Sequence, residues 1–139
     1  MACPASKPRN DAPFGVFLDY YTQRAELTQN RLSVGARINQ SRLNKIANDR
    51  IRDVSVDTLV NLCLVLHLDR EEAKDLLSRK ERAFSPANPV HRSYLELIDE
   101  YSSREIDYTN DMKLSTALGW ADEYLASQGC PALPNADRG

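Results

Sequence analysis

The sequence predicts an all-α protein, with a head of five helices followed by about two additional C-terminal helices. Apolar residues recur every three or four positions along most of the chain, which is the spacing of amphipathic helices. Side chains suited to cap helix N-termini stand directly before several of these stretches. The expected organisation is a disordered leader over residues 1–13, the head over 14–84, a helical segment over 85–128 and a flexible tail over 129–139.

The five helices of the head follow from apolar spacing and caps. The apolar residues of the first helix are Phe14, Phe17, Leu18, Tyr21 and Ala25. A second helix is expected from Thr28, and Asn39 is a suitable N-cap for a third. Ser55 and Asp69 are expected to cap the fourth and fifth helices. The inward residues of these two helices are Leu59, Leu62, Cys63, Leu66, Ala73, Leu76 and Leu77.

Two more helices are expected after the head. Pro86 and Pro89 mark the boundary, and Asn88 is placed to cap a helix that has Pro89 at its first position. Its apolar stripe consists of Val90, Tyr94, Leu97, Ile98 and Tyr101. A last helix over about residues 109–127 has an apolar side that includes Leu114, Leu118 and Leu125.

Composition excludes several classes of protein. With 139 residues and 42% hydrophobic content, the chain is long enough for one domain with a core. No apolar run approaches the length of a transmembrane helix, and the N-terminus lacks the apolar stretch of a secretory signal. The three cysteines are odd in number and widely separated, so no disulfide framework is expected. We therefore expect a cytoplasmic protein without a membrane partner.

Charge is distributed unevenly along the chain. The whole sequence has a net charge of −2, yet residues 27–52 hold six basic residues against the single acid Asp49, a net charge of +5. Residues 93–139 hold three basic residues against nine acids, a net charge of −6. A local basic stretch is what binding to a phosphate backbone requires. The alternative, a merely solvated helix face, is less favoured because the basic stretch coincides with the motif described next.

Residues 29–48 have the pattern of a helix-turn-helix motif. The residues Val34, Gly35 and Ala36 have short side chains, which leave room for close packing at the end of the first helix of the motif. Ile38 is expected to fill the turn. The outward positions of its second helix can hydrogen-bond a base edge or a phosphate, and none is acidic. These positions are Gln40, Ser41, Arg42, Asn44, Lys45 and Asn48. The motif therefore predicts double-stranded DNA as the partner.

The sequence around this motif resembles the lambda-repressor-like, or xenobiotic-response-element, family of helix-turn-helix regulators. The resemblance covers roughly residues 14–84 and rests on four segments. These are Thr28-Gln29-x-x-Leu32, the stretch from Leu43 to Asp49, Arg52-x-Val54-Ser55-x-x-Thr58-Leu59, and Leu62-Cys63-x-x-Leu66-x-Leu68. It implies a sequence-specific transcriptional regulator, expected as a repressor, of bacterial, phage or mobile-element origin.

The resemblance and the motif together imply a set of DNA contacts in which the second helix of the motif enters the major groove. Base edges would be read by Gln40, Ser41, Arg42 and Lys45. Phosphates would be bound by Gln29, Arg31, Arg37, Asn48, Arg50 and Arg52. As similar glutamines do in the family, Gln29 would also support Gln40.

Two departures from the family pattern affect the motif. Arg37 stands where the family usually has Gly in the turn, so a residue with a Cβ is expected to take a left-handed conformation, at a cost of about 1 kcal/mol. Asp49 also stands where Gly is usual, and it brings a negative charge close to the expected DNA backbone. Ser33 and Ala47 replace the usual Ala and Glu.

The apolar faces after residue 85 either wrap back on the head or pair with a second subunit. We favour a homodimer, because helix-turn-helix proteins commonly read two half-sites as symmetric dimers. The residues expected at its interface are Tyr94, Leu97, Ile98, Tyr101, Leu118 and Leu125.

No pattern in the sequence predicts catalysis, a metal or a cofactor. His67 and Cys63 form a lone pair without two further ligands, and Cys63 is better interpreted as a small core residue. Two alternatives to a simple regulator stay open. One is an antitoxin-like regulator whose acidic C-terminal helices bind a partner protein, and the other is an interaction adaptor of the same fold that does not bind DNA.

Overall fold

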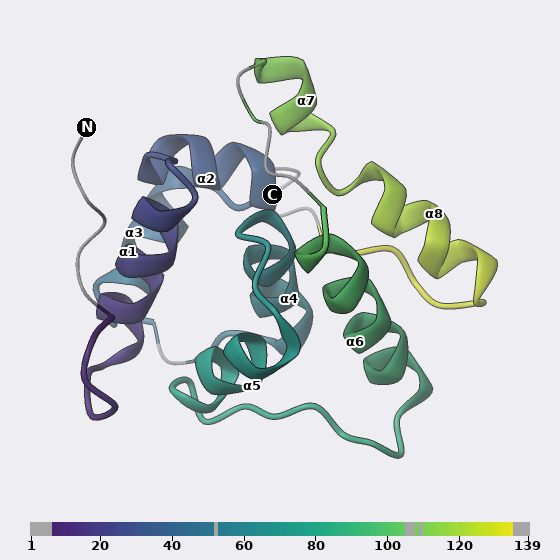
Figure 1. Ribbon diagram of the computed structural model, residues 1–139, viewed down its shortest axis with the longest axis horizontal. Helices are drawn as coiled ribbons and strands as arrows, with labels where there is room; N and C mark the ends of the chain where they lie inside the picture. The colour runs from purple at the N-terminus through teal and green to yellow at the C-terminus, as the bar shows by residue number, and fades with distance from the viewer. Residues whose placement is uncertain (1–6, 52, 105–107, 109, 135–139) are drawn as a thin grey trace.

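A computed structural model describes residues 7–51, 53–104, 108 and 110–134 of the chain (Figure 1). This part contains eight helices and no strand, so the predicted all-α class is confirmed. The helices are α1 (Phe14–Arg24), α2 (Gln29–Ala36), α3 (Gln40–Ala47), α4 (Val56–Val65), α5 (Arg70–Ser78), α6 (Pro89–Ser102), α7 (Asp111–Ser115) and α8 (Gly119–Ser127). None of the described helices combines the length and apolarity needed to cross a membrane.

Side-chain caps form at the start of four helices of the head, and those at Asn39, Ser55 and Asp69 are the ones that the sequence predicts. The side chains of Thr28, Asn39 and Ser55 each accept a hydrogen bond from a backbone N–H in the first turn of α2, α3 and α4. At α5, Asp69 and Glu72 form a reciprocal capping box. Each cap satisfies backbone donors that a helix N-terminus leaves unpaired, so these helix starts are determined locally.

The central element is α4, which lies between α2 and α6 (Figure 1). All eight residues from Thr58 to Val65 are buried, so this helix has no side facing solvent. A helix buried on every side must be covered on every side by other elements. Here α2 and α5 cover part of α4, and α6 covers another part.

The C-terminal segment therefore folds back onto the head, and this corrects the predicted dimer interface. The six residues assigned to that interface are all buried within the single chain, as part of the same core as the head. They are Tyr94, Leu97, Ile98, Tyr101, Leu118 and Leu125. The physical reason is that α4 needs a cover that the head does not supply. A homodimer would have to use another surface.

The last helix is divided where a single one was expected. Between α7 and α8 the chain turns at Thr116–Leu118, and the break lets both Leu114 and Leu118 be buried. Leu114 packs against α2 at Gly35, where an added Cβ would lie 2.9 Å from the Leu114 Cδ1. Gly35, one of the small residues predicted at the end of α2, thus leaves room for the Leu114 side chain of α7.

Parts of both ends that were expected to be loose are packed. Leu133 is buried, its N–H donates to the Asp122 Oδ1 at 3.0 Å, and the Pro134 carbonyl accepts from the Asn61 Nδ2 at 3.0 Å. At the other end, Arg79 donates to the carbonyl oxygens of Asn10 and Ala12. Leu133 and Pro134, which were expected to belong to a flexible tail, are thus in contact with the rest of the chain, and residues 1–6 and 135–139 lie outside the described part.

Candidate nucleic-acid interface

The turn between α2 and α3 has the backbone geometry that the sequence predicts. Arg37 adopts φ 58° and ψ 38°, so the expected left-handed conformation is confirmed. The Ile38 N–H donates to the Ser33 carbonyl at 3.0 Å, which closes the end of α2. The Ile38 side chain is buried in the turn, and Asn39 then caps α3 by accepting from the N–H groups of Ser41 and Arg42.

The two faces of α3 differ sharply. Leu43 and Ile46 are fully buried, and the helix packs on α1 and α2. The opposite face is polar and contains no acid. Its exposed residues are Gln40, Ser41, Asn44, Lys45 and Asn48, and Arg42 is partly exposed. Most of the side chains assigned to base reading thus lie on one open surface, where they can donate hydrogen bonds and attract negative charge.

Three basic residues in α3 and just after it have no acidic partner, as is also true of Lys7, Lys74 and Arg92 elsewhere in the described chain. Within the described residues, Arg42, Lys45 and Arg50 form no ion pair. Eight other basic residues of that part do have an acidic partner. They are Arg9, Arg24, Arg37, Arg70, Arg79, Lys80, Arg82 and Arg104. The cluster at 42–50 therefore has charge available for an outside partner.

Two of the predicted phosphate contacts are held by the C-terminal segment instead. The Arg37 Nη1 lies 2.6 Å from the Asp122 Oδ2 of α8, and both side chains are largely buried. Arg31 donates to the carbonyl oxygen of Tyr108. Both partners lie far away in the sequence, so no local pattern could have revealed them. Gln29 is exposed at the start of α2 as expected, and Arg52 lies outside the described residues.

Asp49, which carries the only negative charge in the basic stretch, has a partner that the sequence did not suggest. It adopts φ 59°, the left-handed region that a glycine would occupy freely. Its carboxylate lies 3.3 Å from the ammonium group of Lys80, in the turn after α5. Lys80 lies in a run of charged residues that would ordinarily be interpreted as a solvated surface, and its side chain is only 5% exposed.

Of the two residues considered as possible metal ligands, Cys63 lies in the core and His67 is partly buried. Cys63 is fully buried, as predicted for a small core residue, and burial raises the pKa of its thiol. Burial also lowers the pKa of His67, whose Nε2 lies 2.9 Å from the Tyr108 hydroxyl. Within the described residues, no group of three or more His, Cys, Asp or Glu side chains is arranged to hold a metal ion.

Comparison of the chain with protein-family models, characterised proteins and solved structures found no match. The resemblance to helix-turn-helix regulators thus rests on the sequence segments that carry it.

Proposed function

We propose that this protein is a helix-turn-helix regulator of the lambda-repressor-like kind, which binds double-stranded DNA with α3 in the major groove. The observation that carries the proposal is the exposed, acid-free face of α3, with three basic residues at 42–50 that lack an acidic partner within the described chain. Exposed arginine and lysine side chains near one helix supply the phosphate attraction that DNA binding needs.

In the proposed mechanism, some residues recognise bases and others bind the phosphate backbone. On the face of α3, the amide of Gln40 can form two hydrogen bonds with adenine, and Lys45 can donate to guanine acceptors. Phosphates would be held by Arg50, by Asn48 and by the exposed Gln29 at the start of α2. Occupation of an operator beside a promoter would then repress transcription.

The first prediction is a steep dependence of DNA affinity on salt. Because binding would neutralise several phosphates and release their counterions, affinity for a duplex should fall by at least about tenfold between low and physiological salt. Gel-shift titrations at several salt concentrations measure this. Binding that does not change with salt, or no binding to any fragment of a genomic library, would contradict the proposal.

The second prediction distinguishes base contacts from phosphate contacts. Gln40→Ala should cost roughly 1 to 3 kcal/mol of discrimination between an operator and random DNA, because one base edge is then no longer read. Arg50→Ala should instead weaken binding to both duplexes alike, since a phosphate contact carries no sequence information. An operator selected from a random duplex pool supplies the probe. Equal losses on both duplexes for Gln40→Ala would show that this residue does not read a base.

A further inference from the structure

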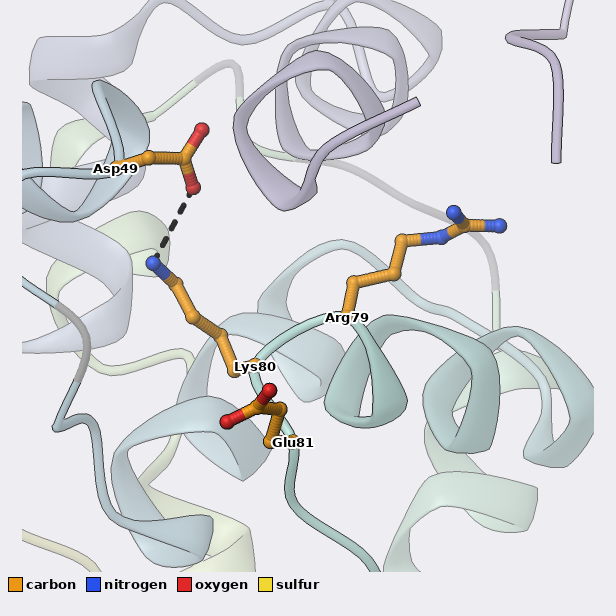
Figure 2. Close-up of a pocket in the computed structure, with 4 residues that line it drawn as sticks. All are labelled: Asp49, Arg79, Lys80 and Glu81. Atoms are coloured by element: carbon orange, nitrogen blue, oxygen red, sulfur yellow. Dashed lines mark hydrogen bonds and ion pairs between the residues drawn. The ribbon is translucent and has the colours of Figure 1, made fainter. Parts of the chain in front are cut away.

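The contact between Lys80 and Asp49 joins the turn after α5 to the loop that follows α3. The Lys80 ammonium lies 3.3 Å from the Asp49 Oδ1 and donates to the Ile51 carbonyl at 2.9 Å. It also lies 4.8 Å from the centre of the Phe14 ring. Figure 2 shows Lys80 extended toward Asp49, whereas Arg79 points away from the pair. Lys80 is thus a largely buried cation directed at the one acid of the basic stretch.

The acid in this pair lies at a sensitive position. Asp49 comes directly after the last turn of α3, between Asn48 and Arg50, and its side chain remains 39% exposed. A carboxylate there would repel a DNA backbone bound by its two neighbours, unless a cation cancels its charge. Arg79 cannot do this, because it pairs with Asp75 at 2.9 Å and lies over the Phe17 ring.

We infer that Lys80 is the built-in counter-charge of Asp49 and that this pair sets the charge of the loop that faces DNA. The inference rests on the proposed function, because it assigns an effect on DNA affinity to a residue that does not itself lie on the exposed face of α3. Lys80 is a positioning residue that acts through Asp49. By cancelling the carboxylate, Lys80 keeps the affinity for any duplex above the value that an unpaired Asp49 would allow.

Two nearly isosteric substitutions test the inference. Lys80→Met removes the cation but keeps an apolar side chain against Phe14, and Asp49→Asn removes the acid while asparagine tolerates the left-handed backbone. The probe is a mixed-sequence DNA duplex, titrated at low and at high salt with the full-length chain. Lys74→Met, at an exposed lysine of α5 without an ion pair in the described structure, is the matched control.

The charge of the loop predicts an order of affinities. At low salt Lys80→Met should bind about threefold to tenfold more weakly than the wild type, and Asp49→Asn more tightly by a similar factor. The double variant, which restores the neutral balance, should bind like the wild type, as should Lys74→Met. These differences should shrink at high salt, because exposed charges are then screened.

A purely structural contact would give another result, because both single variants would then bind more weakly and the double variant would not recover. Asp49→Asn that binds no tighter than the wild type overturns the inference, even if Lys80→Met fails to fold. If the wild-type chain binds no duplex at all, the proposed function itself is wrong and the inference falls with it. Wild-type binding with an unchanged Lys80→Met would overturn the inference alone.

Discussion

Leu97→Ala is expected to lower the free energy of unfolding by about 2 to 5 kcal/mol, because it removes a side chain that is 1% exposed in the core shared by α4 and α6. The cost combines the lost burial of the leucine side chain with the cavity left behind. Chemical denaturation followed by circular dichroism measures the change. The effect should be independent of protein concentration, since Leu97 packs within its own chain.

The same helix supplies a matched control. Leu95 lies two positions earlier in α6 and is only partly buried, so Leu95→Ala should cost clearly less than Leu97→Ala. If instead the apolar stripe of α6 packed on a second subunit, unfolding of the wild type would shift with concentration. Equal losses for the two leucines would also contradict the packing described here.

The packing of α6 on α4 was not predicted from the sequence. The run from Leu59 to Leu66 has apolar residues on every side of the helix, and only Asn61 interrupts it. When only one side of this helix is taken as inward, the five helices of the head suffice to bury it. Because this run is apolar on every side, the sequence did indicate that a further helix must cover it. The stripe of α6 was correctly identified, but its partner was not.

Local features were predicted well because their causes are local. Caps such as Asn39, the left-handed Arg37 and the buried Ile38 depend on interactions within a few residues. The amide of Asn61 shows the contrast, since it donates to carbonyl oxygens of Ala36 and of Pro134 near the end of the chain. No spacing rule connects such positions.

In the candidate site, too, some features could be predicted from local sequence and others could not. The polar face of α3 follows from helical periodicity, and the structure leaves that face exposed. Helical periodicity does not predict which basic side chains form ion pairs, because this depends on which acid lies near each one after folding. Arg37 pairs with Asp122 and Lys80 with Asp49, and both pairs join segments distant in the sequence. Net charge over a window therefore indicates a basic surface but not which of its residues are available.

Gly15→Ala is expected to disturb both stability and DNA binding, because α1 and the end of α3 approach closely at this glycine. A Cβ on Gly15 would lie 2.0 Å from the Ala47 carbonyl oxygen, a backbone atom that cannot move unless α3 moves with it. Alanine normally favours a helix over glycine by up to about 1 kcal/mol. Here the steric overlap should outweigh that gain and give a net loss of about 1 to 3 kcal/mol.

Gly119→Ala is the control for this substitution, because a Cβ there would meet nothing within 4 Å. It should leave the free energy of unfolding unchanged or raise it slightly, by up to about 1 kcal/mol. Thermal unfolding and duplex titrations of both variants measure the contrast. Displacement of α3 should weaken binding of Gly15→Ala to its operator more than to random DNA, since base contacts depend on the placement of the helix more than phosphate contacts do. A Gly15→Ala variant as stable as Gly119→Ala would show that α1 and α3 do not approach as closely as the structure places them.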